Sequence, residues 1–324
     1  MIRTLIRPVN LLVAGYSYLK SPVTHSATAN GMPVSISAEL TNNCNLACPE
    51  CLSGSGRMQR ELGFMKVELF NRFMDELRPY LYNINLFFQG EPMLHPLFTS
   101  FIESCKNTRS VISTNGHFLS EENCGKIANS GLSKLIVSLD GMDQDTYSAY
   151  RINGVSDIVI DGIRNVSAAK TRYRSSLKIE IQLLVNRLNE NQIPQIKQFA
   201  NSVKASLNLK SMQIINKEDI GAWLPVQKKF RRYKMKDGEY ILKNSLPNKC
   251  ARLWLNPVIT WDGKVVPCCF DKNAEYVMGD LNHDTFKEIW NGPKYRIFRK
   301  SILSGRNMIE ICRNCTSGLK GVKY

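Results

Sequence analysis

Apolar positions between residues 34 and 216 follow two alternating patterns, short continuous runs and runs spaced by three or four residues. The short runs predict strands and the wider spacing predicts helices. The expected strands are 34–40, 83–89, 110–113, 134–139, 177–185 and 211–215, and the expected helices lie near 66–81, 96–107, 120–130, 156–173 and 190–205. Strands that alternate with helices favour a parallel sheet with right-handed crossovers. We therefore expect an α/β fold in which residues 34–216 form a partial (β/α)6 TIM-type barrel.

The chain after residue 216 loses this alternation. Residues 217–249 include the run from Lys228 to Lys236, which is mostly basic, and we expect a basic connector. This run is either a solvated linker or a patch for a phosphate-bearing substrate. Residues 250–324 contain a hairpin signal, Asp262-Gly263 between strand-prone runs, and a helical pattern near 284–303. They are expected to form a small cysteine-rich α+β domain.

The N-terminal segment, residues 1–33, has its own pattern. Its apolar residues recur at helical spacing, and the chain has no acidic residue before position 39. The residues at that spacing are Leu5, Val9, Leu12, Tyr16 and Leu19. We expect a basic amphipathic helix that packs on the barrel or, alternatively, touches an anionic membrane surface. A secretory signal is disfavoured because Pro8 and Asn10 interrupt the apolar stretch.

Composition says little about the fold of this protein and more about its binding partners. The 324 residues are 43% hydrophobic and 22% charged, which are ordinary globular values. Lysine and arginine outnumber aspartate and glutamate by 43 to 28, which gives a net charge of +15. Such a charge favours anionic partners: a phosphorylated substrate, an acidic electron donor, an anionic membrane or nucleic acid.

The spacing of the ten cysteines indicates metal chemistry. Cys44, Cys48 and Cys51 form a C-x3-C-x2-C run, and Cys312 and Cys315 form a C-x2-C pair. Such spacings let several thiolates converge on one metal or cluster. Three thiolates in one loop are one short of a closed tetrahedral zinc site. They suffice to hold three irons of a cubane cluster and to leave the fourth iron open to a small molecule.

Cys44, Cys48 and Cys51, placed after the strand-like residues 34–40, resemble the signature of radical S-adenosylmethionine enzymes. The resemblance implies a [4Fe-4S] cluster whose open iron chelates S-adenosylmethionine. It also implies reductive cleavage of this cofactor to a 5′-deoxyadenosyl radical, which abstracts hydrogen from the substrate. Glu50 departs from the pattern, because the residue before the third cysteine is often aromatic in this family and lies near the adenine.

The same resemblance assigns cofactor contacts to residues at the ends of the predicted strands, where ligands of such folds gather. Gly90 and Glu91 match a Gly-Glu segment whose backbone and carboxylate bind the methionine ammonium. The other expected contacts, near the ribose, the methionine carboxylate and the adenine, are Ser113, Asn115, Ser138, Asp140, Arg151 and Val185. The residues alone also allow a surface ion pair for Arg151 and a core position for Val185.

The C-terminal cysteines resemble the auxiliary iron–sulfur domain of the SPASM and twitch subfamilies, including the Asp-Gly turn and the following Pro-Cys-Cys. The resemblance implies one auxiliary [4Fe-4S] cluster, because seven cysteines would be needed for two. Its expected ligands are Cys250, Cys268, Cys312 and Cys315. Cys269 could replace Cys268, because neighbouring residues on a strand point to opposite faces. A zinc ribbon would use the same four thiolates.

The function that this pattern favours is hydrogen abstraction from a small polar, anionic substrate, such as a sugar or a nucleotide-linked or lipid-linked metabolite. An oxidoreductase of dehydrogenase type is expected, with the auxiliary cluster as electron acceptor. The alternatives are a peptide- or protein-modifying maturase and, outside the enzymes, a zinc-bearing nucleic-acid-binding protein.

The expected partners follow from the same chemistry. They are the anionic small molecule, a reductant of ferredoxin or flavodoxin type and, through the N-terminal segment, a membrane surface. Nucleic acid is disfavoured because no recognised nucleic-acid module surrounds the basic run. The expected location is the cytoplasm, with the inner face of the membrane as an alternative. The sequence does not single out a catalytic base.

Overall fold

The computed structural model describes residues 2–315, which form two compact units. The first unit contains residues 2–43, 58–110 and 246–315, and the second contains residues 44–57 and 111–245. Each unit contains strands, helices and buried apolar residues of its own.

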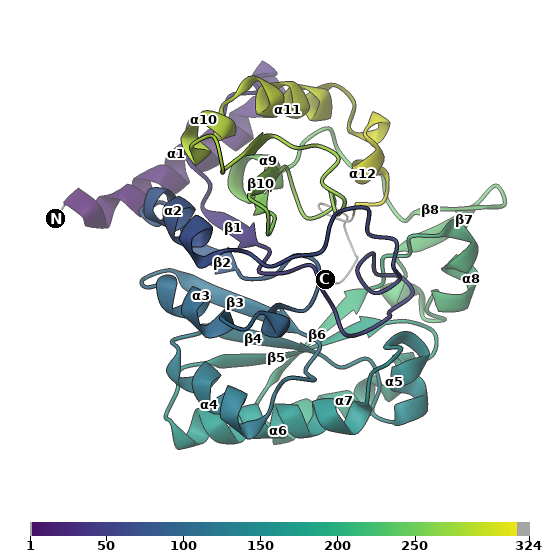
Figure 1. The fold of residues 1–324 in the computed structure, drawn as a ribbon. Helices are drawn as coiled ribbons and strands as arrows, with labels where there is room; N and C mark the ends of the chain where they lie inside the picture. Colours follow the sequence, from purple (N-terminus) through teal and green to yellow (C-terminus); the bar gives the residue numbers. More distant parts are fainter. Residues whose placement is uncertain (1, 316–324) are drawn as a thin grey trace. The chain divides into compact units, whose positions relative to one another are not determined.

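The second unit contains four neighbouring strands that are all parallel. They are β3 (Arg109–Thr114), β4 (Lys134–Ser138), β5 (Lys178–Val185) and β6 (Ser206–Ser211). Helices α4 (Glu121–Asn129), α6 (Ser156–Arg172) and α7 (Ile193–Ser202) lie along one face of these strands (Figure 1). Parallel strands need such crossover helices to connect them, so the predicted alternation is confirmed for this part of the chain.

The first unit contains five strands whose order is β11-β10-β9-β1-β2. Strand β1 (Ser35–Ala38) is parallel both to β2 (Asn83–Asn85) and to β9 (Val258–Ile259). Strands β10 (Lys264–Val266) and β11 (Gly279–Asp280) continue the sheet in antiparallel fashion. The turn between β9 and β10 contains Gly263 at φ +90°, a conformation that glycine adopts without strain. The predicted Asp-Gly hairpin is therefore present.

Helices of the first unit pack on this sheet through aromatic side chains. Helix α2 (Val67–Leu77) buries Phe70 and Phe73, and Phe70 packs edge-on against Phe101 of α3 (Phe98–Ser104). The remaining helices of this unit are α1 (Ile2–Thr24), α9 (Arg252–Leu255), α10 (Phe286–Trp290), α11 (Pro293–Gly305) and α12 (Glu310–Arg313). None of the helices within residues 2–315 is long and apolar enough to cross a membrane.

Two predicted elements are placed differently by the structure. The sixth strand is β6, at residues 206–211, and not 211–215. The apolar residues Met212 and Ile214 leave the sheet and are buried in a separate apolar cluster, so their apolarity reflects that cluster. The helix expected at 284–303 is split into α10 and α11, because Gly292 begins a new helix with Pro293 at its first position.

The stretch expected as a basic connector is folded. It contains α8 (Ile220–Trp223) and the antiparallel pair β7 (Tyr233–Lys236) and β8 (Glu239–Leu242), all in the second unit. Short 3-10 turns precede them at Lys217–Asp219 and Lys228–Phe230. A further helix that the pattern did not predict, α5 (Gln144–Tyr150), is capped by the Asp143 side chain, which accepts a hydrogen bond from the Thr146 backbone.

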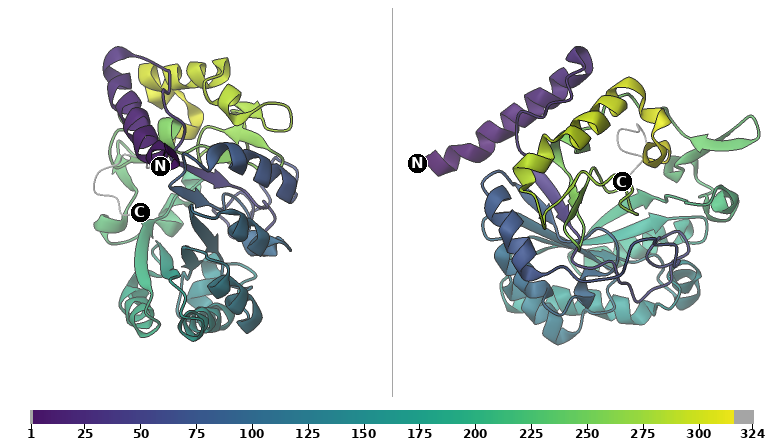
Figure 2. Two further views of the ribbon diagram at one scale, coloured as in Figure 1. Left: turned by 90° about the vertical axis from the view of Figure 1, so that its left-hand side faces the viewer. Right: turned by 45° about the horizontal axis from the view of Figure 1, so that its top comes forward.

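The N-terminal segment forms the predicted helix, and it packs on the rest of the first unit through its small and polar face. Its small and polar residues Ala14, Ser17 and Ser21 are buried against the first unit, while its large apolar residues are exposed. Two views show α1 as a long helix at the edge of the first unit, beside α11 (Figures 1 and 2). The helix therefore packs on the protein as expected, and its large apolar residues face solvent.

Candidate functional site

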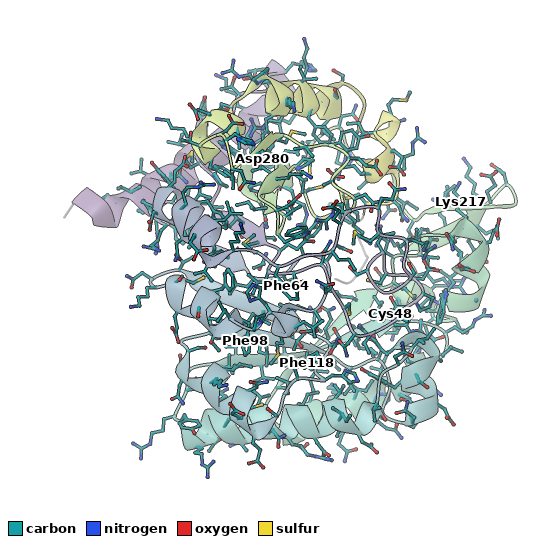
Figure 3. The ribbon with its side chains drawn as sticks, in the orientation of Figure 1. Cys48, Phe64, Phe98, Phe118, Lys217 and Asp280 are labelled. Atoms are coloured by element: carbon teal, nitrogen blue, oxygen red, sulfur yellow. The ribbon has the colours of Figure 1, made fainter. Side chains whose placement is uncertain are left out.

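The loop that carries Cys44, Cys48 and Cys51 belongs to the second unit and turns back on itself. The Cys51 amide donates to the Cys48 carbonyl at 3.2 Å, and the Ser55 amide donates to the Cys51 carbonyl at 2.8 Å. A Cβ on Gly54 would lie 2.6 Å from the Cys48 backbone nitrogen, so only glycine fits there. Cys48 is marked in Figure 3. The loop therefore presents three thiols from eight consecutive residues.

An apolar cluster in the second unit packs against all three cysteines. Its members come from the loop itself, from the end of α5, from the chain after β6, and from α8 and the β7–β8 pair. The buried members are Leu46, Cys48, Tyr150, Met212, Ile214, Ile220, Leu224 and Tyr233, with Leu184, Trp223, Tyr240 and Leu242 at the margin. The cluster buries Cys48 and leaves Cys44 and Cys51 half-buried, so it limits the access of water to one side of the loop.

Two side chains donate hydrogen bonds to the sulfur atoms of this loop. Asn115 Nδ2 lies 4.0 Å from Cys44 Sγ, and Arg151 Nη1 lies 3.8 Å from Cys48 Sγ. The backbone amide of Leu46 also donates to Cys44 Sγ, at 3.5 Å. Burial raises the pKa of the Cys48 thiol, and the positive charge of Arg151 opposes that rise. Donors aimed at sulfur stabilise thiolates that ligate a metal or cluster.

Arg151 is held by a buried ion pair. Its Nε atom lies 2.6 Å from Asp140 Oδ2, and the Asp140 carboxylate also accepts from the Leu184 amide at 2.7 Å. Burial opposes the charge on Arg151, yet Asp140 and the Cys48 sulfur hold the pKa of its guanidinium well above the usual value. The surface ion pair that the sequence allowed for Arg151 is wrong, because the Asp140 side chain is fully buried.

The other cofactor contacts predicted for the second unit lie at or just after the ends of its strands, as does Asp140, the ion-pair partner of Arg151. Asn115 donates to Asn45 Oδ1 at 2.7 Å and accepts from the amide and Nδ1 of His117. Ser138 and Val185 are buried at the ends of β4 and β5, and Ser113 is half-buried near the end of β3. The structure thus places Asn115 and Arg151 in contact with the cysteine loop. Asp140 contacts Arg151 and reaches the loop only through it.

Two further side chains fix the loop to the chain after β6. The sequence marked Glu50 only as a departure from the motif, and it did not single out Arg57. The Glu50 carboxylate accepts from the Ile215 amide at 2.5 Å, and burial raises its pKa. Arg57 donates to Asn216 Oδ1 at 2.7 Å and to the Pro49 carbonyl. Glu50 occupies the position before the third cysteine, which is often aromatic in this family. This departure from the motif was the sequence feature that could have indicated a different role for Glu50.

Gly90 and Glu91 belong to the first unit and contact the three residues that precede Cys44 in the chain. A Cβ on Gly90, whose φ is +74°, would lie 2.6 Å from the backbone of Asn42 and Asn43. The Glu91 amide donates to the Asn43 carbonyl at 2.7 Å. The buried Glu91 carboxylate accepts from the Met93 amide at 3.0 Å and caps the 3-10 turn Pro92–Leu94. The predicted close backbone approach at Gly90 is present.

Four buried thiols gather in the C-terminal part of the first unit. Cys268 interacts electrostatically with Cys250 and Cys315, and Cys312 interacts with the same two. All four are 7% exposed or less. They come from four segments: the chain before α9, the chain after β10, helix α12 and the residue two beyond it. Cys269 is more exposed than Cys268. After burial, Cys269 contributes most to the raised pKa of Cys268, and it is also the main cause of the raised pKa of Arg252.

Two arginines supply positive charge to this thiol group. Arg306 is buried, donates to Cys315 Sγ at 3.3 Å and reaches the Lys249 carbonyl at 2.9 Å. Burial opposes its charge, but the neighbouring cysteines raise the pKa of its guanidinium. Cys269, followed by Cys268, raises the pKa of Arg252. Cationic donors around convergent thiolates are typical of a site for an anionic iron–sulfur cluster.

Asp271 lies next to these cysteines in the chain and has a role of its own. The side chain is fully buried and accepts from the amides of Glu275 and Tyr276 at 2.8 and 3.0 Å. Burial raises the pKa of Asp271 to about 6, and these two hydrogen bonds oppose that rise. The carboxylate therefore fixes the turn that follows β10.

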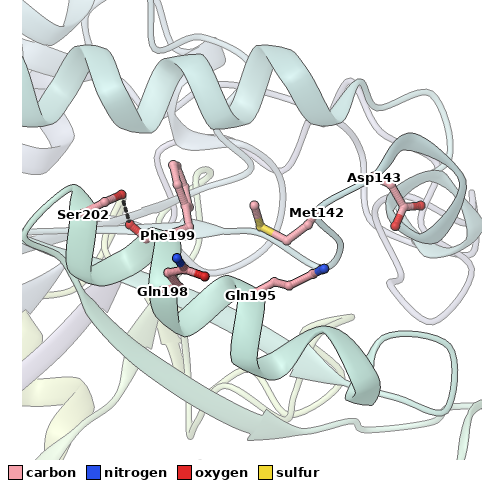
Figure 4. A pocket seen from close by; sticks show the side chains of 6 residues that line it. All are labelled: Met142, Asp143, Gln195, Gln198, Phe199 and Ser202. Atoms are coloured by element: carbon pink, nitrogen blue, oxygen red, sulfur yellow. Dashed lines mark hydrogen bonds between the residues drawn. The ribbon is translucent and has the colours of Figure 1, made fainter.

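A pocket of about 550 Å³ opens in the second unit, away from the cysteine loop. It lies between the chain before α5 and helix α7, as Figure 4 shows. Its lining residues are Met142, Asp143, Gln195, Gln198, Phe199 and Ser202. None of these is a thiol or a predicted cofactor contact.

The donor sets fit iron–sulfur clusters. Within residues 2–315 no three cysteine, histidine or acidic side chains lie close enough to hold a single metal ion. A cubane cluster has an iron at each of four corners and accepts thiolates that are farther apart than those of a single zinc ion. The three-thiol loop with its sulfur-directed donors fits a cluster with an open iron, and the four-thiol group fits a closed cluster.

Two family profiles match this chain. The sequence profile of the radical SAM superfamily matches residues 38–200, about half of the chain. The profile of an iron–sulfur cluster-binding domain, SPASM, matches residues 250–316. The S-adenosyl-L-methionine-dependent 2-deoxy-scyllo-inosamine dehydrogenase of Niallia circulans is 24% identical over 87% of this chain and 92% of its own length. The mycofactocin maturase of Mycobacterium ulcerans is 25% identical over 84% of this chain and 79% of its length.

Solved structures share the fold. A crystal structure of BtrN in complex with AdoMet and 2-DOIA covers 89% of this chain and 94% of its own, with a TM-score of 0.56 and 22% identity. Streptococcus suis SuiB bound to the precursor peptide SuiA covers 87% of this chain and 69% of its own, with a TM-score of 0.63 and 13% identity. The predicted α/β partial-barrel class is thereby confirmed.

The family follows from the length of the radical SAM profile match. The two matched ranges include the cysteines of both groups. This protein belongs to the radical SAM superfamily, and its cofactors are S-adenosylmethionine, a [4Fe-4S] cluster and the auxiliary iron–sulfur cluster of a SPASM domain.

Proposed function

We propose that this radical SAM enzyme is a dehydrogenase that oxidises a small polar, anionic substrate: a sugar or a nucleotide-linked or lipid-linked metabolite. The observation that carries the proposal is the single group of four buried thiols, Cys250, Cys268, Cys312 and Cys315, with cationic donors around it. One closed cluster in addition to the radical cluster would provide one electron acceptor. The match over nearly the full length of a dehydrogenase also supports this assignment.

The residues of the cysteine loop and its surroundings have separate roles in the proposal. Cys44, Cys48 and Cys51 hold the radical cluster, and Glu91 binds the methionine ammonium through its carboxylate. When bound, S-adenosylmethionine and the reduced cluster supply a 5′-deoxyadenosyl radical. The apolar cluster against the loop excludes water, and Arg151, fixed by Asp140, directs a positive charge at Cys48.

The oxidation balances with one electron acceptor. The substrate loses a hydrogen atom from a carbon that bears a hydroxyl group, and this atom becomes part of 5′-deoxyadenosine. The substrate then loses the hydroxyl proton to solvent and one electron to the auxiliary cluster, which leaves a carbonyl group. The net change in the substrate is a two-electron oxidation. A low-potential reductant of ferredoxin or flavodoxin type supplies the first electron, and the net charge of +15 favours docking of such an acidic protein.

A peptide-modifying maturase is the second candidate. It is favoured by the similarity to mycofactocin maturase and by the fold shared with SuiB, which was solved with its precursor peptide. The zinc-bearing nucleic-acid-binding alternative loses its basis, because the chain belongs to the radical SAM superfamily. The two enzyme candidates differ in the mass of what accumulates when the enzyme is missing.

The substrate class is tested by comparing small metabolites and peptides between a deletion strain and its parent, both grown without oxygen. The dehydrogenase proposal predicts that a small hydroxylated, anionic compound accumulates in the deletion strain and is oxidised by the purified enzyme. Accumulation of an unmodified peptide, with no change among small metabolites, would overturn the substrate class.

The role of the auxiliary cluster is tested by replacing its ligands. Variants that lack Cys250, Cys268, Cys312 or Cys315 should form 5′-deoxyadenosine without substrate yet fail to oxidise the substrate, because the electron acceptor is lost. A purely structural cluster predicts that both activities and thermal stability decline together, since site binding and folding are coupled. Cys269→Ala is the matched control and should keep its iron. Loss of iron from Cys269→Ala but not from Cys268→Ala would contradict the ligand assignment.

A further inference from the structure

Helix α1 presents a continuous apolar stripe to solvent. Six of its large residues are between 54% and 83% exposed. They recur at intervals of three or four residues and are Leu5, Val9, Leu12, Tyr16, Leu19 and Val23. At about 1.5 Å of rise per residue the stripe is about 27 Å long. A surface helix of a globular protein normally buries such a stripe, so this face is available to a partner.

The opposite face of the helix is fixed to the first unit by polar contacts. Asn10 donates to the Met32 carbonyl at 2.9 Å and accepts from its amide at 2.8 Å. Ser17 donates to the Thr28 carbonyl at 2.9 Å. Arg7 donates to the carbonyls of Asn107 and Arg78. These hydrogen bonds, which include those of the buried residues Asn10 and Ser17, set the rotation of the helix, so the apolar stripe cannot turn inward without breaking them.

The charge around the stripe selects the partner. The chain has no acidic residue before position 39, whereas Arg3, Arg7 and Lys20 are basic. Lys20 lies over the Tyr16 ring with its Nζ 5.8 Å from the centroid, at the edge of the stripe. An aromatic residue and a lysine flanking an apolar face are suited to the boundary between lipid tails and headgroups. A second copy of this chain is a poorer partner, because each copy carries a net charge of +15.

We propose that α1 lies in the plane of an anionic lipid membrane, with its apolar stripe among the acyl chains and Lys20, at the edge of the stripe, at the headgroups. The helix then holds the enzyme at the membrane surface without crossing it, in agreement with the lack of a spanning helix within residues 2–315. This inference does not depend on the reaction that the enzyme catalyses, and its test needs no substrate.

The test is sedimentation of the full-length, cluster-loaded protein with vesicles. One set of vesicles contains phosphatidylcholine and phosphatidylglycerol in equal parts, and the other contains phosphatidylcholine alone. The protein should bind the anionic vesicles, and Leu12→Ser/Leu19→Ser should bind them at least about tenfold more weakly, since two leucines no longer enter the apolar layer. Lys20→Gln should weaken binding to anionic vesicles by a few-fold.

A matched control keeps the test falsifiable. Ile158→Ser/Ile297→Ser makes the same kind of change at two exposed apolar positions on α6 and α11 and should bind vesicles like the parent. Thermal unfolding should be unchanged in both double variants, because all four side chains are exposed. Absence of binding to anionic vesicles, or equal binding by Leu12→Ser/Leu19→Ser, overturns the proposal. A dimer in light scattering that this variant abolishes, without vesicle binding, overturns it in favour of self-association.

Discussion

A buried carboxylate, Glu39, joins the strand before the cysteine loop to the C-terminal part of the first unit. Its side chain is fully buried and receives two bonds from Arg60, at 2.6 and 2.7 Å, and one from the Trp261 amide at 3.2 Å. Arg60 also donates to the Lys272 carbonyl at 3.0 Å. Burial raises the pKa of Glu39, and the Arg60 guanidinium opposes that rise. Each charge therefore stabilises the other inside the protein, where either charge alone would be strongly destabilising.

Arg60→Met should lower the free energy of unfolding by about 3–5 kcal/mol at pH 7, because it leaves the Glu39 carboxylate buried without a counter-charge. The deficit should shrink as the pH falls. A carboxyl whose pKa is raised in the folded state binds more protons there than in the unfolded state, so lowering the pH favours the folded state. Denaturant unfolding at several pH values measures both effects. The control is Glu39→Gln/Arg60→Gln, which removes both charges and should be less destabilised than Arg60→Met.

Glu91 combines two duties that one pair of substitutions can separate. Glu91→Gln keeps an acceptor for the Met93 amide but removes the charge, whereas Glu91→Ala removes both. If the carboxylate binds the methionine ammonium, both variants should lose about ten- to a hundredfold in affinity for S-adenosylmethionine. Anaerobic titration measures this. Full affinity in Glu91→Gln would show that the residue serves only the turn.

At the scale of elements, the β7–β8 pair contributes to the cysteine loop rather than linking two domains. Tyr233 of β7 is buried in the apolar cluster around Cys48. Its hydroxyl accepts from the Ile214 amide at 3.0 Å and donates to the Ile214 carbonyl at 3.2 Å. The exposed lysines of the basic run lie on the same segment, at 228, 229, 234 and 236. The lysines of this run are therefore solvated, as the linker alternative predicted, whereas its aromatic residues are buried.

Tyr233→Ala should destabilise the second unit by about 3–5 kcal/mol, in the range of large-to-small aromatic substitutions in a core. It should also open the apolar cluster, so that the radical cluster bleaches faster in air. Tyr233→Phe keeps the packing and loses the two hydrogen bonds, so its bleaching rate should stay close to that of the parent. Met235→Ala, at an exposed position of the same strand, is the control for strand β7. Equal bleaching in all three variants would contradict a shielding role.

Residue patterns predicted elements well where burial alone decides them, and less well where polar contacts do. The alternation of Ile179, Ile181 and Leu183 predicts β5 because one side of that strand is buried. The same reasoning placed β6 at the wrong residues, because the apolar residues Met212 and Ile214 pack against the cysteine loop and not in the sheet. It also did not show which face of α1 packs on the protein, because Asn10 and Ser17 are fixed by hydrogen bonds to the Met32 and Thr28 carbonyls, which no periodicity reveals.

The cysteines were the most predictable part of the candidate sites. Their spacing indicates clusters without any knowledge of the fold, because thiolates a few residues apart can converge in many conformations. The residues that hold the cysteine loop were less predictable. Glu50 and Arg57 bond to Ile215 and Asn216, more than 150 residues away in sequence, so only the folded chain reveals these contacts.

At the scale of the whole molecule, the two cysteine groups divide the chemistry between the two units. The second unit contains the three-thiol loop and the first contains the four-thiol group. Two cubane clusters correspond to about eight irons per chain, and removing either ligand set should therefore remove about half of them. Iron and acid-labile sulfide in anaerobically prepared protein measure this division directly. Retention of all the iron by either cysteine variant would contradict the assignment of two separate clusters.

The central claim, that Cys44, Cys48 and Cys51 hold the cluster that cleaves S-adenosylmethionine, is tested most directly by one product. The anaerobic, cluster-loaded protein is mixed with S-adenosylmethionine and dithionite, and 5′-deoxyadenosine is quantified by mass spectrometry. The parent should form 5′-deoxyadenosine, and Cys44→Ala/Cys48→Ala/Cys51→Ala should form none while its auxiliary cluster remains, because methyl groups cannot replace thiolate ligands. Undiminished 5′-deoxyadenosine formation by the triple variant would contradict the account.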